Sequence, residues 1–96
     1  MDFGQALSEA KAGKKISRAG WNGKGMYVVQ MPGYSSIAAN ANTAKAHGIS
    51  EGSPVTTAPY LVMRAVNPPG VEGLYLVPGW LASQADMLAD DWGVVS

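Results

Sequence analysis

The sequence predicts an α+β domain, in which an antiparallel sheet of four or five strands carries an N-terminal helix and a short C-terminal helix. Apolar runs of strand length at 26–31, 60–66 and 74–77 are separated by turns rich in Gly and Pro. Helix-start patterns stand at Asp2 and Ser83. Ninety-six residues suit a single domain, 1–96, near the lower size limit for a self-sufficient core.

The first helix is expected in "MDFGQALSEAKAGKK". Asp2 is a suitable N-cap with Gln5 three residues later, and Gly13 suits the left-handed end of the helix. Its apolar face is predicted to contain Phe3, Leu7 and Ala10.

Two strands are expected next. "KISRAG", which begins at Lys15, predicts a short strand, and "MYVVQM" at 26–31 predicts a strand covered on both faces. Asn22-Gly23 between them predicts a two-residue type I′ hairpin turn, because both turn positions require positive φ.

Residues 32–58 form a long connection of small residues punctuated by Gly and Pro. "ANTAKAH" before Gly48 predicts two helical turns, and the remainder is expected to be loop. A connection of this length within a small domain is usually functional or mobile.

The C-terminal third predicts a hairpin, a helix and a strand. "YLVMRAV" at 60–66 and "LYLV" at 74–77 flank the turn "NPPGVEG". Ser83 and Asp86 form a capping box, with Met87 and Leu88 expected to face inward. Acidic residues 90–91 disfavour a long helix, and "WGVV" suggests a last strand.

The apolar strands also predict self-association. Several strands are apolar on both faces, whereas two short helices can cover only one face of the sheet. The uncovered face is therefore expected to pack against another subunit.

Composition excludes several classes of protein. Seven basic and seven acidic residues cancel, so no polymeric nucleic acid is expected as a partner. Cysteine is absent, which excludes disulfides, Cys-based zinc sites and thiol nucleophiles. No signal peptide or membrane-spanning run is found, so we expect a cytoplasmic protein without a membrane partner.

Catalysis is poorly supported by the sequence. The single histidine, His47, lies in the long connection, where an exposed or structural role is favoured over catalysis. Neither metal-ligand spacing nor G-x-S-x-G occurs, so no metal and no cofactor are expected. Glycines 20, 23 and 25 match neither a dinucleotide fingerprint nor a P-loop.

The segment from Trp21 to Gly25 has two interpretations. In the first, it is a hairpin whose Trp21 packs on the core. In the second, it is the edge of a pocket: Trp21 stacks on a base, Asn22 supplies an amide, and Lys24 supplies charge. Gly23 and Gly25 would then let backbone N–H groups approach a phosphate.

"GWLASQAD" has the same ambiguity. Capping alone accounts for Ser83 and Asp86, whereas Trp80 and Gln84 are not needed for a cap and suit an anion or a purine edge. Arg64, on the strand face of Tyr60, is either an edge-strand charge or an inward phosphate contact.

Four stretches, in this order, carry a resemblance to a known family: "AGWNGKGMYV", "NANTA", "APYLVMRAV" and "PGWLASQADMLADDW". They resemble the second type of phage Thoeris anti-defence protein, from Asp2 to Val95. The resemblance implies a homotetrameric sponge with pockets at subunit interfaces, which is not an enzyme. The implied partners are cyclic nucleotide signals: chiefly a glycosyl-linked cyclic ADP-ribose made by TIR-domain proteins, and in some members CBASS cyclic oligonucleotides.

The resemblance also implies which residues bind the signal. The W-N-G-K motif supplies Trp21, Asn22, Gly23 and Lys24, and the W-L-A-S-Q-x-D motif supplies Trp80, Ser83, Gln84 and Asp86. Second choices are Tyr27 and Tyr60, and third choices, suited to a second ligand, are Asn40, Asn42 and Thr43. The expected location is the cytoplasm of the infected host. The alternatives are a small phage structural or adaptor protein and, less favoured, an enzyme that cleaves cyclic nucleotides.

Overall fold

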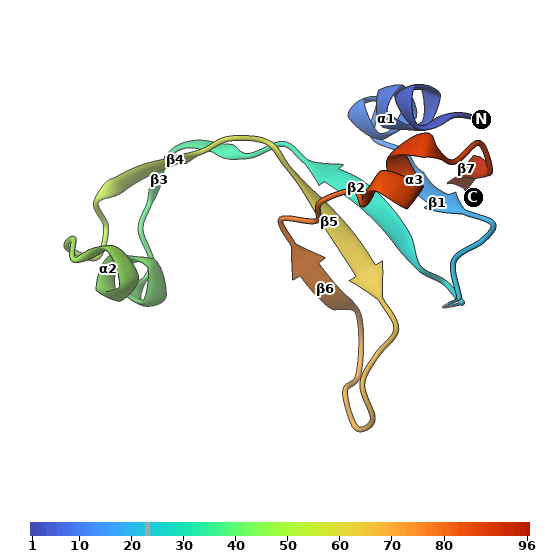
Figure 1. The fold of residues 1–96 in the computed structure, drawn as a ribbon. Coiled ribbons are helices and arrows are strands. Elements are labelled where there is room, and N and C mark those ends of the chain that lie inside the picture. Colours follow the sequence, from blue (N-terminus) through green and yellow to red (C-terminus); the bar gives the residue numbers. More distant parts are fainter. Residues whose placement is uncertain (23) are drawn as a thin grey trace.

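The computed structural model describes residues 1–22 and 24–96, and these residues form a body of sheet and helices from which an arm projects (Figure 1). The body contains α1 (Phe3–Lys11), β1 (Lys15–Arg18), β2 (Tyr27–Met31), β5 (Tyr60–Ala65), β6 (Tyr75–Pro78), α3 (Gln84–Leu88) and β7 (Trp92–Val95). The arm contains β3 (Tyr34–Ala38), α2 (Ala41–His47) and β4 (Pro54–Thr57).

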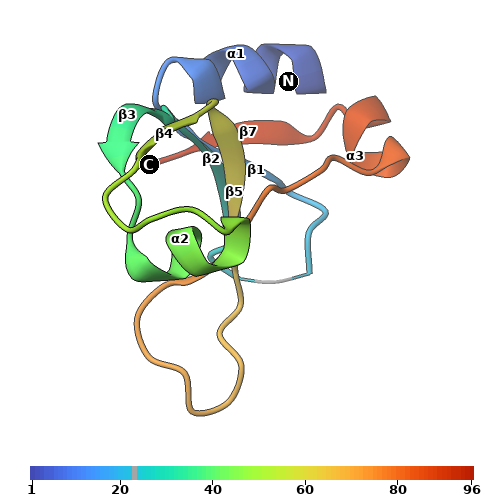
Figure 2. The ribbon, with the colours of Figure 1, turned by 90° about the vertical axis from the view of Figure 1, so that its left-hand side faces the viewer.

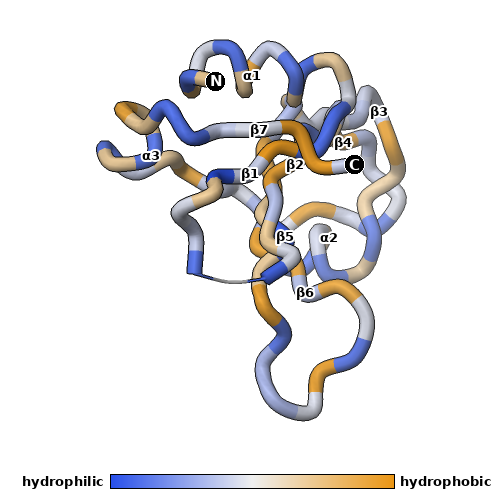
Figure 3. Tube along the Cα trace, turned by 90° about the vertical axis from the view of Figure 1, so that its right-hand side faces the viewer, coloured by the Kyte–Doolittle hydropathy of each residue, from blue (hydrophilic) through white to orange (hydrophobic). Residues whose placement is uncertain are grey.

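The body's sheet confirms the predicted α+β class. Within the described residues it has five antiparallel strands in the order β6-β5-β2-β1-β7. Hydrophobic stretches follow its central strands (Figure 3). The strand expected at 74–77 lies one residue later, and β5 is an inner strand. The interpretation of Arg64 as an edge-strand charge is therefore wrong.

Helix α1 covers one face of this sheet (Figure 2). The expected capping box between Asp2 and Gln5 is present, and Gly13 after the helix has φ +92°. Two fully buried alanines, Ala6 and Ala10, let the helix approach the sheet closely. Beneath them lie the core side chains Ile16, Val28 and Trp92.

The opposite face of the sheet is uncovered in the described chain, as the sequence predicts. Strand alternation places apolar side chains there, because neighbours of core residues such as Val28 point the other way. Leu74 is 61% exposed and Leu76 is 48% exposed. The solvent-facing side of the body therefore carries a broad apolar surface.

The arm corrects the expectation that residues 32–58 are loop apart from one helix. The helical turns of "ANTAKAH" are confirmed as α2, capped by Asn40 and by Gly48 in the left-handed conformation. However, β3, which precedes this helix in the sequence, pairs with β4, which follows it, and the two strands form an antiparallel ribbon. All five residues of β3 are exposed, so the strand carries none of the alternating burial that sequence patterns detect.

The connection between β1 and β2 corrects a second expectation. The strands end at Arg18 and resume at Tyr27, so a two-residue turn at Asn22-Gly23 is wrong. The reason is that residues after Arg18 bond to the C-terminal segment instead of to β2: the Ala19 N–H donates to the Asp91 carbonyl at 3.1 Å. Gly23 itself lies outside the described residues.

Helix α3 ends early, as the acidic residues after it predict, and its capping box between Ser83 and Asp86 is confirmed. The expectation that Met87 and Leu88 face inward is wrong, because they are 49% and 81% exposed. The side of α3 that faces the body is instead held by polar bonds to Asp86. Strand β7 confirms the predicted last strand.

No helix in the described part of the chain has the length and apolar character needed to cross a membrane.

Candidate functional site

The two tryptophan motifs, far apart in the sequence, meet beside the core. The rings of Trp21 and Trp80 lie 6.2 Å apart between centroids. Trp92 contacts both, at 5.2 Å from Trp21 and 6.3 Å from Trp80. All three contacts are edge to face, an arrangement favoured by the ring quadrupoles. Both motif tryptophans are only partly buried, so each combines core packing with an accessible surface.

Gly79 brings Trp80 into this cluster. Its φ of +72° is in the left-handed region, where glycine avoids the steric cost of a side chain. The N–H groups of Gly79 and Trp80 both donate to the Leu61 carbonyl, at 2.9 and 3.0 Å. The chain thus leaves β6 and turns toward the face covered by α1.

The carboxylate of Asp86 joins the two motifs. Its Oδ1 accepts from Arg18 Nη1 at 2.9 Å and from Trp21 Nε1 at 3.1 Å. Its Oδ2 accepts from the Ser83 N–H at 3.3 Å. Burial acts to raise the pKa of Asp86, but the hydrogen bonds from Arg18, Trp21 and Ser83 outweigh it, and the pKa is lowered. Asp86 therefore does more than cap α3.

A second carboxylate completes the cluster. Asp91 Oδ1 accepts from Arg18 Nε at 2.8 Å, and its Oδ2 accepts from the Gly20 N–H at 2.8 Å. The hydrogen bond from Arg18 holds the pKa of Asp91 below its ordinary value. Bonds to Asp91 and then Asp86 raise the pKa of Arg18. One guanidinium thus spans two carboxylates with the fork geometry that lysine lacks.

The remaining predicted residues of the two motifs are exposed. Asn22 and Lys24 lie in the loop between β1 and β2, and Ser83 and Gln84 lie at the start of α3. Gly23 lies outside the described residues. Both motifs therefore contribute polar side chains that are open to solvent.

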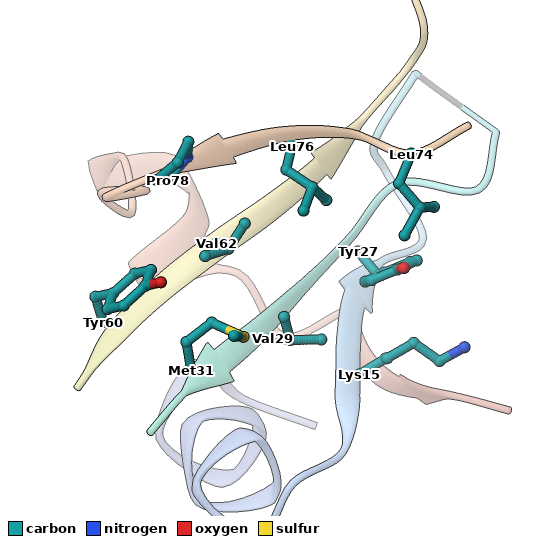
Figure 4. A pocket seen from close by; sticks show the side chains of 9 residues that line it. All are labelled: Lys15, Tyr27, Val29, Met31, Tyr60, Val62, Leu74, Leu76 and Pro78. Carbon is teal, nitrogen blue, oxygen red and sulfur yellow. The ribbon is translucent and has the colours of Figure 1, made fainter. Parts of the chain in front are cut away.

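Tyr27 and Tyr60, the second choices, lie on the other face of the sheet from the tryptophan cluster. They line a hollow of about 310 Å³ on the open face, together with apolar side chains that include Val29, Met31, Val62 and Leu76 (Figure 4). The ammonium group of Lys15 stands 5.1 Å from the centre of the Tyr27 ring. The structure thus divides the candidate residues of one chain between two faces.

The third choices lie on the arm. Asn40 caps α2, because its Oδ1 accepts from the Thr43 N–H at 2.8 Å, and Asn42 is exposed in the first turn. His47 is exposed at the end of α2. Across residues 1–22 and 24–96, no three side chains of His, Cys, Asp or Glu gather as a metal ion would require.

Sequence reasoning did not identify Arg18 and Asp91 as members of this hydrogen-bonded cluster. Arg18 stands three residues before the first tryptophan motif, and Asp91, five residues after the second motif, was interpreted only as a helix stop. An arginine shortly before one motif and an acid shortly after the other were the available signal. Pairing them requires the knowledge that β1 and β7 are neighbours, with Arg18 opposite Trp92.

Acid should weaken this cluster. The pKa values of Asp86 and Asp91 are lowered from 3.8, so their stabilisation is present above that value and is lost as the pH falls through the folded-state values. We expect the free energy of unfolding, measured by urea titration, to fall steeply below about pH 4. Asp86→Asn and Asp91→Asn should flatten this dependence, whereas Asp90→Asn, at an exposed neighbour, should preserve it. An equally steep acid limb in all three variants would contradict the assignment.

Comparison with known proteins identifies the family of this chain. The family model described as "Tad2-like: Thoeris anti-defense 2-like domain" matches residues 1–95. Thoeris anti-defense 2 of Bacillus phage SP01 is 32% identical over 96 residues, covering 100% of this chain and 96% of the relative. The matched span includes both tryptophan motifs, the cluster between them and the arm. The chain belongs to the Tad2-like family of Thoeris anti-defense proteins.

Proposed function

We propose that this protein binds and sequesters cyclic nucleotide immune signals in the cytoplasm of an infected bacterium, without degrading them. The principal ligand is a glycosyl-linked cyclic ADP-ribose made by TIR-domain proteins of the Thoeris system. Cyclic oligonucleotides of CBASS systems are further ligands. The protein acts as a sponge, which lowers the free concentration of a signal by mass action and leaves the molecule intact.

The observation that carries this proposal is the meeting of the two tryptophan motifs within a chain that matches the family from end to end. Trp21 and Trp80 are side by side at 6.2 Å, although 59 positions separate their numbers. The shared carboxylate of Asp86 fixes their motifs together. A ligand with both aromatic and polar parts requires this combination of rings and exposed polar groups.

Each part of the site suits one part of a cyclic ADP-ribose. Interplanar angles of 72–79° mean that no indole of the cluster stacks parallel on another, which favours adenine as a stacking partner for Trp21 or Trp80. Asn22, Ser83 and Gln84 supply directional donors and acceptors for ribose. Lys24, with the neighbouring glycine backbone, supplies charge and N–H groups for the pyrophosphate.

Assembly is part of the proposal. The open apolar face of the sheet and the projecting arm favour a homo-oligomer, which we propose is a tetramer with pockets between subunits. In such an assembly, Tyr27 and Tyr60 of one subunit would complete a site to which another subunit brings its tryptophan motifs. This arrangement accounts for candidate residues that lie on both faces of a single chain.

Two other functions fit less well. Cleavage of the signal needs an acid, base or nucleophile at the site. Arg18, Asp86 and Asp91 are engaged with one another, and His47 lies on the arm. A purely structural phage protein does not need exposed Asn22, Lys24 and Gln84 beside a tryptophan pair.

Capture and release tests the proposal directly. The purified protein is mixed with cyclic ADP-ribose isomers and a panel of cyclic di- and trinucleotides, filtered, and then heat-denatured. We expect depletion of a ligand followed by its release with unchanged mass and retention time. Release of altered products would identify an enzyme instead, and no depletion of any member of the panel would leave only a structural role.

Trp21→Ala should abolish capture. Because Trp21 also packs on Trp92, the variant loses packing as well as its stacking surface. Phe3→Ala is the matched control, since Phe3 packs on the same Trp92 at 5.3 Å but belongs to neither motif. We expect both variants to lower the melting temperature and to keep the oligomeric mass, whereas only Trp21→Ala loses the ligand. Equal loss of capture in both would indicate that Trp21 serves only the core.

Lys24→Ala should weaken binding in a salt-dependent way if the ammonium group faces a phosphate. The affinity difference from the unsubstituted protein should be about tenfold at low salt and should shrink as added salt screens the charge. Lys11→Ala, which removes an exposed lysine at the end of α1, is the control and should bind normally. Calorimetric titration at two salt concentrations measures both, and an unchanged affinity would place Lys24 in solvent.

A further inference from the structure

We infer that Arg18 and Asp91, which belong to neither tryptophan motif, are positioning residues for the binding site. This inference rests on the proposed function. They hold the first residues of the loop between β1 and β2 against the segment between α3 and β7. Neither has to touch the ligand, since the Arg18 side chain is bonded to Asp91 and Asp86, and the Asp91 side chain to Arg18 and the Gly20 N–H.

The contacts form a continuous clamp. Asp91 receives Arg18 on one oxygen and the Gly20 N–H on the other, both at 2.8 Å. Its carbonyl receives the Ala19 N–H at 3.1 Å. Trp21 is attached as well, because its Nε1 donates to Asp86. Three successive residues at the start of the loop, Ala19, Gly20 and Trp21, are therefore bonded to α3 or to the segment that follows it.

The space around Gly20 shows how closely the clamp is fitted. A Cβ added at Gly20 would lie 2.9 Å from Asp91 Oδ2 and 3.5 Å from Arg18 Nη2. The carboxylate is held on both oxygens and cannot move aside without losing a hydrogen bond. Any larger residue at position 20 would therefore have to displace the carboxylate and disturb these hydrogen bonds.

Burial makes the clamp stiffer than a surface ion pair. The side chains of Arg18, Asp86 and Asp91 are 19%, 14% and 30% exposed. A partly desolvated guanidinium shared by two carboxylates is held in one geometry, unlike the mobile pairs typical of exposed surfaces. The exposed loop residues Asn22 and Lys24 therefore start from a fixed base at Trp21, which reduces the ordering entropy lost when a ligand binds.

Asp91→Asn tests this role, with Asp90→Asn as its matched control. Asp91→Asn keeps the size of the side chain and removes its charge, whereas Asp90 is exposed next to it. Arg18→Lys is the second variant, because lysine keeps the charge but cannot span both carboxylates. Folding of each variant is checked by circular dichroism and thermal melting, and binding is measured well below the melting temperature.

Two readouts are compared. Calorimetric titration with the cyclic ADP-ribose isomer captured by the unsubstituted protein gives affinity, and amide hydrogen exchange gives the order of the loop. We expect Asp91→Asn and Arg18→Lys to lose affinity by about tenfold or more. The Gly20 amide should exchange faster while the amide of core residue Val28 stays protected. Asp90→Asn should match the unsubstituted protein in both readouts.

Each contrary result has a distinct meaning. Unchanged affinity in both clamp variants, with faster exchange at Gly20, would overturn the positioning role. Unchanged exchange at Gly20 would show that the clamp does not order the loop and would also overturn it. Lost affinity together with lost protection at Val28 would indicate general destabilisation and a merely structural role. If the unsubstituted protein and Asp90→Asn also fail to bind, the proposed function is wrong, and the positioning role fails with it.

Discussion

The rest of the candidate site depends on the hydrogen bonds accepted by the carboxylate of Asp86. It receives a guanidinium from the end of β1, an indole N–H from the first tryptophan motif and a backbone N–H from the start of α3. The backbone carbonyl of Asp86 accepts a hydrogen bond from the indole N–H of Trp92 at 2.8 Å. Removing this residue would leave several partly buried donors without acceptors, and an unsatisfied buried donor costs more than the bond itself gains. One residue thereby links a strand end, a loop and a helix cap through its side chain, and the core through its backbone carbonyl.

These bonds also connect the two ends of the chain. Asp86 and Asp91 bind residues 65 to 73 positions away, and β7 pairs with β1 along its whole length. Contacts of such long range require the entropy of closing the chain to be lost before they are gained. The tryptophan cluster consequently exists only in a chain whose sheet has closed. The proposed binding site therefore depends on closure of the sheet, whereas the arm is linked to the sheet through β2 and β5.

Features that depend on residues close together in the sequence were predicted correctly, whereas features that depend on the order of the strands were not. The caps at Asp2 and Ser83 are local hydrogen bonds between near neighbours, and the sequence predicted both. Apolar runs identified the main strands, because burial on the sheet leaves a visible pattern. The ribbon of β3 and β4 carries no such pattern, since its residues are largely exposed.

The site was predictable in part for the same reason. Trp21, Trp80 and Asp86 stand out by their residue types and motifs, but nothing local indicates that one carboxylate joins them. Arg18 and Asp91 were missed because their partners are set by strand order. The prediction of a two-residue hairpin turn at Asn22-Gly23 was wrong, because the residues after Arg18 form hydrogen bonds with Asp91 instead of continuing the pairing with β2. The prediction that Met87 and Leu88 face inward was wrong, because a five-residue helix that is attached through its polar side can leave its apolar side chains exposed.

The way the arm joins the sheet has a consequence for its permitted length. Met31 and Tyr60 are register partners at the end of β2 and β5, so the arm leaves and re-enters the body at a single point. For the sheet, the whole excursion is one long hairpin loop. Doubling the length of such a loop costs only about 0.6 kcal/mol of closure entropy. A change in the length of this segment would therefore leave the strand register of the body and the tryptophan cluster in place, because the sheet is held only at the two ends of the excursion.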